Sequence, residues 1–251
     1  PLCAMIRNSD QRSGDYAGLA DKPRPGHADY TAWVKWKGLA DMRGGGHFSG
    51  RLTLPLTAAG VVAKKLLDGV RFTTRLTEVG GECDPARFET VLREAAAAGD
   101  SVGAVAECRA EGCGVGWGEP FFDTAEGLIA HLLYAVPGIK GVEFGDGFAA
   151  ARLRGSEHND PILNAAGTTA TNHAGGVAGG ILNGNPLIVR AAFKPTASIA
   201  REQFTFDAAT GRQEPLAIGG RHDVCIAIRG AAAVEAAVAI ALADLKLRCR
   251  L

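Results

Sequence analysis

The segment AAAVEAAVAIALADLKL, residues 231–247, is the most informative part of this chain for predicting its fold. It consists almost entirely of Ala, Val, Ile and Leu, and its length and composition predict a helix. A helix that is apolar on nearly every side must be buried on nearly every side. We therefore expect this helix to lie between layers of secondary structure rather than on the surface of one layer.

The remaining segments predict further helices and strands around this one. Helices are expected where Pro or an N-cap residue begins a segment and Gly or Pro ends it, and strands where β-branched residues cluster or polarity alternates. The expected helices are residues 55–67, 85–98 and 124–136, and the expected strands are residues 71–79, 101–108, 141–153, 187–193 and 224–229. Helices grouped against hairpin-like strands favour an α+β fold, in a single domain over residues 1–251.

Composition narrows the classes of function. Lys plus Arg and Asp plus Glu both total 27, so the formal net charge is zero. This balance argues against nucleic acid or an anionic membrane as the main partner. The six cysteines lack CxxC spacing, which favours free thiols in a reducing cytoplasm and gives no support for a metal site. No apolar run is long enough to span a bilayer.

The segment GGRHDVC, residues 219–225, is the first candidate site. Two glycines precede Arg221, His222 and Asp223, which supply a permanent cation, a group that titrates near neutral pH and a carboxylate. Such a set can hold an anion and move a proton. A solvated turn is the alternative interpretation.

Two further polar clusters lie in the first fifth of the chain. In RPGHAD, residues 24–29, the Pro-Gly turn can bring Arg24 and His27 to one side. The alternative interpretation is a surface loop that simply carries polar side chains. In RGGGHFSGR, residues 43–51, exposed backbone N–H groups can cradle a phosphate, and Arg51 precedes a helix start. A glycine-rich linker explains the second segment equally well.

Two later segments also combine glycine or proline with polar groups. KPTASI, residues 194–199, follows an expected strand and offers a lysine and two hydroxyls to a phosphate or a flavin. A simple strand-ending turn is the alternative. GGVAGGILNG, residues 175–184, predicts either a loop close to a ligand or a tight turn.

Together these motifs give the chain a specific resemblance to the chorismate synthase family. The motifs occur in the family's order and cover essentially the whole chain. They are RNSDQRSGDY (7–16), RPGHADY (24–30), RGGG (43–46), GVEFGDGF (141–148), GSEHND (155–160), TNHAGG (171–176), KPTASI (194–199) and GRHD (220–223).

The resemblance implies a β-α-β sandwich with long helices between antiparallel sheets, assembled as a homotetramer. It implies anti-1,4 elimination of phosphate from 5-enolpyruvylshikimate 3-phosphate, giving chorismate, with reduced FMN as a cofactor that is not consumed. NADPH or another cellular donor would reduce the flavin. The family's opening segment with its GESHG motif does not appear, so we expect a fragment of a longer enzyme. A naturally short, catalytically impaired homologue is the alternative.

The resemblance also assigns roles to residues. His27 and Asp223 match catalytic positions, while Arg24, Arg51 and Arg221 match substrate-binding positions. The cofactor-binding positions are His47, Phe48, Ser49, Pro137, Gly138, Gly179, Lys194, Pro195, Thr196, Ala197, Ser198 and Arg221. His47 stands where the family usually has Arg, and Val224 where Pro is common.

Two other classes of function compete with this interpretation. One is a protein that binds flavin or phosphate without turnover, since the cofactor loops are present while the GESHG segment is not. The other is a nicotinamide-dependent FMN reductase, for which the sequence offers no GxGxxG fingerprint.

Overall fold

The computed structural model describes residues 2–7, 21–41, 43–219 and 222–249. The helices are α1 (Asp29–Lys35), α2 (Thr53–Leu66), α3 (Phe88–Ala97), α4 (Ala125–Tyr134), α5 (Gly155–His158) and α6 (Ala227–Arg248). The strands are β1 (Arg71–Val79), β2 (Ala104–Glu111), β3 (Ile139–Phe144), β4 (Val177–Ala178), β5 (Ile181–Leu182), β6 (Leu187–Phe193), β7 (Gln203–Asp207) and β8 (Arg212–Leu216).

A four-stranded antiparallel sheet of order β1-β2-β6-β3 forms the main layer. Every second residue of its two central strands points to one buried face. Ala106 pairs with Ala191 and Cys108 with Val189, and all four side chains are buried. Because these residues are small or β-branched, helices can approach the sheet closely on this face.

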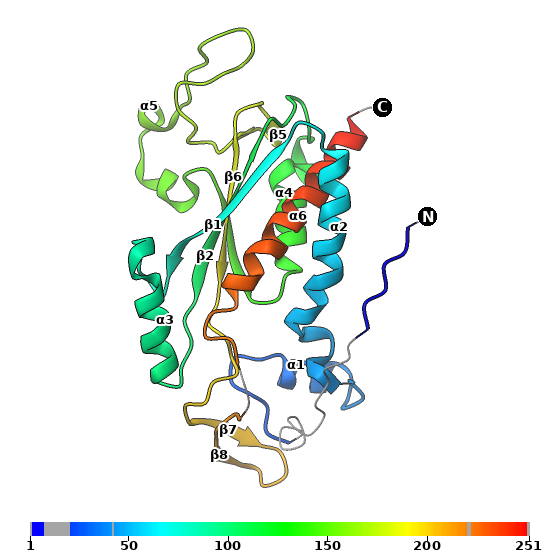
Figure 1. The fold of residues 1–251 in the computed structure, drawn as a ribbon, viewed down its shortest axis with the longest axis vertical. Helices are drawn as coiled ribbons and strands as arrows, with labels where there is room; N and C mark the ends of the chain where they lie inside the picture. Colours follow the sequence, from blue (N-terminus) through cyan, green and yellow to red (C-terminus); the bar gives the residue numbers. More distant parts are fainter. Residues whose placement is uncertain (1, 8–20, 42, 220–221, 250–251) are drawn as a thin grey trace.

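A layer of three helices covers that buried face, with α6 between α2 and α4 (Figure 1). The helix α6 also packs on β1 and β2. Most of the α6 residues from Ala233 to Leu245 are buried. The expectation that residues 231–247 form an enclosed helix is therefore confirmed.

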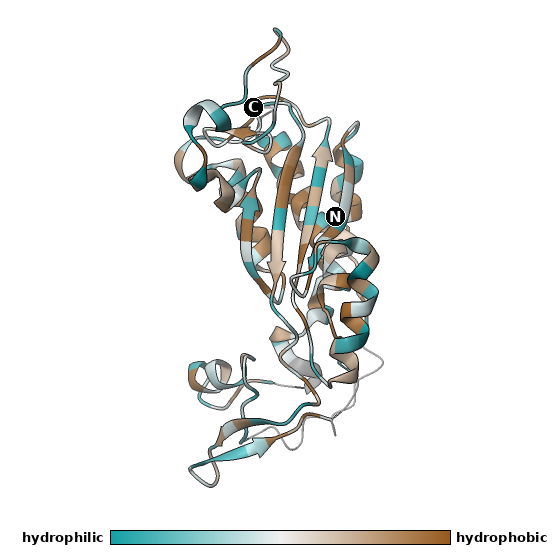
Figure 2. Ribbon diagram, turned by 90° about the vertical axis from the view of Figure 1, so that its left-hand side faces the viewer, coloured by the Kyte–Doolittle hydropathy of each residue, from teal (hydrophilic) through white to brown (hydrophobic). Residues whose placement is uncertain are grey.

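The opposite face of the sheet carries charged side chains in alternating order across the strands. Glu107 lies opposite both Arg75 and Arg190, and Arg190 lies opposite Glu143. The Nε of Arg190 is 2.9 Å from Glu143 Oε1. The strand ribbons accordingly show alternating hydrophilic and hydrophobic bands, with most helices behind the sheet and α3 in front (Figure 2).

The structure confirms the α+β class and corrects two expected strands. The bounds of β1 and β6 match the expected strands 71–79 and 187–193. The expected strand 224–229 is wrong, because Ala227 already lies in α6 and its side chain is fully buried. The expected strand 141–153 ends at Phe144, because Gly145 has a φ of +53° and a 3-10 turn follows.

At one end of the sheet, the segment before α1 is attached to the β7–β8 hairpin (Figure 1). Ala208 N donates to Asp21 O at 2.9 Å, and Thr205 Oγ1 donates to Pro23 O. Lys22 forms an ion pair with Glu214 at 2.6 Å. These bonds hold the residues that lead into the RPGHAD motif against the β7–β8 hairpin. No helix in the described part of the chain combines the length and apolar character needed to cross a membrane.

Candidate active site

The candidate site begins where β6 ends. Because β3 and β6 are antiparallel, the start of β3 lies beside the end of β6, and Lys194 N donates to Gly138 O at 2.9 Å. Further along the same loop, Thr196 Oγ1 donates to the carbonyl oxygen of Asp223 at 2.6 Å. Segments 137–138, 194–198 and 222–223, all singled out in the sequence, therefore meet at one end of the sheet.

The RPGHAD segment attaches to the same loop through two side chains. Lys194 Nζ donates to the carbonyl oxygen of Gly26. Arg24 Nη1 donates to Ser198 Oγ at 3.2 Å. Gly26 has a φ of +68°, a conformation that favours glycine, so the turn before His27 depends on this residue.

A compact group of Arg24, His27 and Asp29 lies within this segment. Arg24 Nε donates to Asp29 Oδ2 at 2.7 Å and Arg24 Nη2 donates to Asp29 Oδ1 at 2.8 Å. His27 Nδ1 lies 2.6 Å from Asp29 Oδ1. Burial disfavours ionised Asp29, but the hydrogen bonds from Arg24 and His27 prevail and hold the pKa of its carboxyl well below the usual range.

Aromatic packing connects residues 47–49 to this group. The ring of Phe48 meets His27 edge to face, with centroids 6.5 Å apart, and lies 6.0 Å from the ring of Trp36. Phe48 ends one 3-10 turn, and Ser49 begins the next by accepting a hydrogen bond from the backbone N–H of Arg51. His47 and Arg51 are exposed here, immediately before α2.

Two lysines, Lys140 and Lys194, lie close together at this end of the sheet. Burial, together with the nearby charge of Lys140, lowers the pKa of Lys194. Like charges held close together are stabilised by a bound anion. The arrangement therefore suits a phosphate group.

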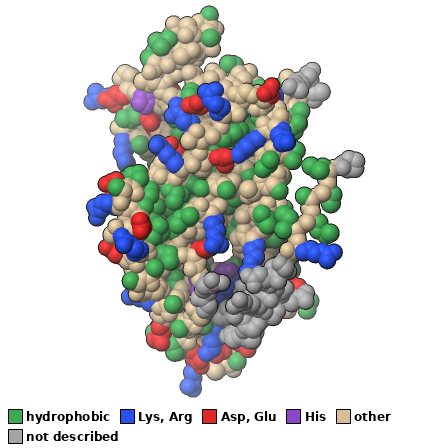
Figure 3. Space-filling view, viewed as in Figure 1, with side chains coloured by type: hydrophobic (Ala, Val, Ile, Leu, Met, Phe, Trp, Pro, Cys, Tyr) green, Lys and Arg blue, Asp and Glu red, His purple; other side chains and the backbone are tan. Residues whose placement is uncertain are grey.

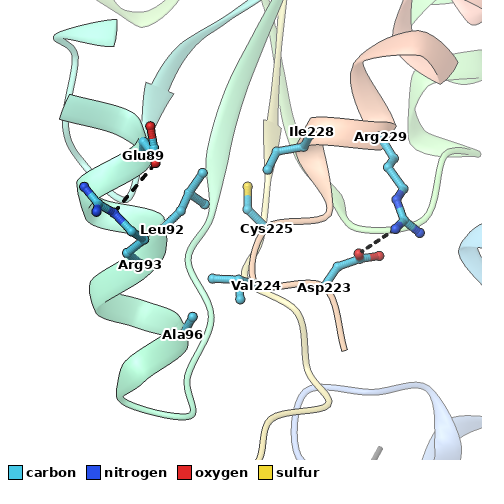
Figure 4. Close-up of a pocket in the computed structure, with 9 residues that line it drawn as sticks. All are labelled: Glu89, Leu92, Arg93, Ala96, Asp223, Val224, Cys225, Ile228 and Arg229. Atoms are coloured by element: carbon cyan, nitrogen blue, oxygen red, sulfur yellow. Dashed lines mark ion pairs between the residues drawn. The ribbon is translucent and has the colours of Figure 1, made fainter. Parts of the chain in front are cut away.

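The side chain of Asp223 lies at the start of α6. Asp223 Oδ1 is 3.4 Å from Arg229 Nη2, and the carboxylate is partly exposed. Asp223 also lines a cavity of about 350 Å³ between α3 and α6, together with Leu92, Cys225 and other side chains (Figure 4). Hydrophobic side chains gather at the surface over this region (Figure 3).

One of the expected site residues that the structure describes is not part of this group. Gly179 lies in the turn between β4 and β5, next to the start of β6 rather than its end. The β4–β5 turn, which Figure 1 marks by the label of β5, lies at the opposite end of the sheet. Arg221 lies outside the described residues.

Three contributors to the site had no role assigned from the sequence, namely Asp29, Trp36 and Lys140. Asp29 follows His27 by two residues, and this spacing was the available signal for a carboxylate at the imidazole. Nothing in the sequence around Trp36 or Lys140 indicates that they would lie near Phe48 and Lys194.

Comparison with known proteins gives a consistent result. The family model described as chorismate synthase matches residues 1–247. A chorismate synthase from Chitinophaga pinensis is 54% identical over 248 residues, which cover 98% of this chain and 74% of that protein. The chorismate synthase of Korarchaeum cryptofilum is 44% identical, over 97% of this chain and 75% of the other.

The chain belongs to the chorismate synthase family. It is an enzyme of the lyase class and of the shikimate pathway, as chorismate synthases are. A crystal structure of a chorismate synthase superposes with a TM-score of 0.69 at 25% identity, covering 86% of this chain and 69% of that one. The expected resemblance and the expected α+β fold are both confirmed.

Proposed function

We propose that this chorismate synthase family member converts 5-enolpyruvylshikimate 3-phosphate into chorismate by anti-1,4 elimination. One observation carries the proposal. Side chains and backbone from four distant segments, including His27, Lys194 and Asp223, are joined by hydrogen bonds at one end of the sheet. The reaction breaks the bond from carbon to the phosphate oxygen and removes the proton at C6, so it needs both cations and a proton acceptor.

The residues present fit reduced FMN as the cofactor. Lys194, close to Lys140, offers positive charge for a phosphate, and Ser49 and Ser198 add hydroxyl groups. Phe48 and Trp36 present aromatic surface beside His27. Reduced flavin supplies electron density that favours expulsion of phosphate. We propose the matched positions 47–49, 137–138, 194–198 and Arg221 as its ligands, with NADPH or another cellular donor as the reductant; Gly179, at the opposite end of the sheet, is left out of this set.

We propose separate roles for the charged and titratable side chains of this chain. Arg51, with Arg221, binds the anionic groups of the substrate and offsets the charge that develops on the leaving phosphate. His27 exchanges a proton at the substrate or the cofactor, and Asp223 takes part in removing the C6 proton. His47 stands where an arginine is usual in the family.

The assembly and the location complete the proposal. We propose a homotetramer that works in the cytoplasm. The small-molecule substrate is its main partner, and neither nucleic acid nor membrane is required.

Variants of His27 and Asp223 test this assignment. Chorismate formation is followed by chromatography, and reduced-FMN affinity is measured separately by anaerobic titration. We expect Asp223→Ala and His27→Ala to abolish turnover while flavin affinity stays within a few-fold of wild type. Full activity in Asp223→Ala would contradict the role of this carboxylate. As a control, Asp244→Ala at the far end of α6 should retain activity.

A further inference from the structure

His27 Nδ1 has two close polar neighbours, of which one requires a hydrogen-bond donor and the other an acceptor. Asp29 Oδ1 lies 2.6 Å away and accepts hydrogen bonds, whereas Arg24 Nη2 lies 3.0 Å away and only donates. Nδ1 can satisfy one of them in a given tautomer, because it either carries a proton or presents a lone pair.

The electrostatics decide between these two neighbours. Asp29 is ionised, since its pKa lies well below the usual range, so it holds no proton to donate. The contact with Asp29 is also the shorter one, and Arg24 Nη2 already donates to Asp29 Oδ1 at 2.8 Å. Nδ1 therefore carries the proton, and neutral His27 has its lone pair on Nε2.

Arg24 fixes the carboxylate in this orientation. Its guanidinium donates one hydrogen bond to each oxygen of Asp29, and its backbone N–H donates a third, to Oδ2 at 3.0 Å. The arginine is 8% exposed, and its remaining donor group reaches Ser198 on the 194–198 loop. The charge of Arg24 is thus directed at protein groups rather than at a ligand.

We propose that Asp29 is a positioning residue that keeps His27 in the Nδ1–H tautomer, with Arg24 as the clamp that holds Asp29. Nε2 is then the nitrogen that accepts or returns a proton during turnover, a consequence that rests on the proposed function. This assigns Arg24 a role different from the substrate binding that the family resemblance implied. Among the described residues, Nε2 has no hydrogen-bond partner.

The substitution Asp29→Asn makes the proposal sharply testable. Arg24 directs two N–H donors at Oδ2 and one at Oδ1, so Oδ2 becomes the amide oxygen. The amide NH₂ then occupies the place of Oδ1, beside His27. With donors on both sides, Nδ1 must accept, and the proton moves to Nε2. The variant keeps the shape of the side chain but inverts the tautomer.

The measurement is ¹⁵N NMR of histidine-labelled protein without flavin or substrate, near pH 9, with the His27 signals assigned by their loss in His27→Gln. We expect Nδ1–H in wild type and Nε2–H in Asp29→Asn. An Nε2–H tautomer in wild type overturns the proposal without any variant, and so does an unchanged tautomer in a folded Asp29→Asn protein.

Activity measurements connect the tautomer with function. We expect kcat of Asp29→Asn to fall by about 10²–10⁴-fold, as for other histidines held in the wrong tautomer, with reduced-FMN affinity unchanged. Asp146→Asn is the matched control, because Asp146 lies 2.6 Å from His173 Nδ1 at the other end of the sheet. It should alter the His173 signals and leave those of His27 and the turnover unchanged.

These outcomes separate the two proposals. A wild-type protein with Nδ1–H but no chorismate formation would contradict the proposed function and leave the tautomer assignment standing. Undiminished turnover in Asp29→Asn with an inverted tautomer would overturn the positioning role and leave the proposed function standing.

Discussion

Gly60 of α2 lies directly against Ala236 of α6. A Cβ atom at Gly60 would meet the Cβ of Ala236 and would lie 2.6 Å from its Cα. The two helices are therefore in backbone contact at this point, and α2 packs on α6 more extensively than any other helix does.

We predict that Gly60→Val is markedly destabilising. The added carbons have no space, so the helices must separate, at a cost of about 1–3 kcal/mol. The free energy of unfolding in urea measures the effect. Gly155→Val is the control, because a Cβ at Gly155 meets no atom within 4 Å. Equal stability of the two variants would contradict the close approach of α2 and α6.

The cysteines are predicted to fall into two classes of reactivity. Burial raises the pKa of the Cys108 thiol to about 12 and that of Cys113 to about 11. A buried thiol that stays protonated is a poor nucleophile. Mass spectrometry after brief alkylation of the native protein should therefore find Cys83 labelled before Cys108 and Cys113. Labelling of Cys108 at the rate of Cys83, which is exposed, would contradict the sheet–helix packing.

The ion pair of Asp29 should make stability depend on pH in a defined direction. Since folding lowers the pKa of this carboxyl from its ordinary value of 3.8, the pair stabilises the protein at pH values above that range. The stabilisation is lost as the pH falls through about 4 and below. Urea unfolding at several pH values should show a gap between wild type and Asp29→Asn at pH 7 that narrows toward pH 3. A gap that widens on acidification would have the wrong sign.

Lys194 is predicted to be a main contributor to anion binding. Replacing it with Met removes a charge-assisted hydrogen-bond donor, which we expect to weaken reduced-FMN binding by about 10–100-fold. Anaerobic titration followed by flavin absorbance gives the affinity. Lys65→Met, on the exposed side of α2, is the control and should bind normally. Equal affinities for both variants would remove Lys194 from the site.

The sequence was most informative where local pattern and burial agree. Residues 71–79 and 187–193 form strands with the expected bounds because polarity alternation, small residues and flanking glycines all favour the same structure. The enclosed α6 follows from composition alone. Residues 224–229 show the limit, because their β-branched run favours a strand while burial of Ala227 against the sheet extends the helix instead.

Elements that depend on distant contacts were not predictable. The helix α1 is short and begins inside the RPGHAD motif. The β7–β8 hairpin has exposed Phe204 and Phe206, and its attachment to residues 21–23 depends on contacts between distant segments. The motifs identified most of the candidate site, but which charges pair within it required coordinates. Arg24 and Asp29 are the clearest example, because the sequence offers Arg24 equally to a ligand or to a neighbouring carboxylate.

The most direct test of the proposed function is a single-turnover reaction of the wild-type protein with 5-enolpyruvylshikimate 3-phosphate and reduced FMN, without oxygen. Phosphate, chorismate and the flavin spectrum are recorded together. We expect equal amounts of phosphate and chorismate, with the flavin reduced at the end. Tight binding of reduced FMN without release of phosphate would contradict it and would support a protein that binds the cofactor without catalysis.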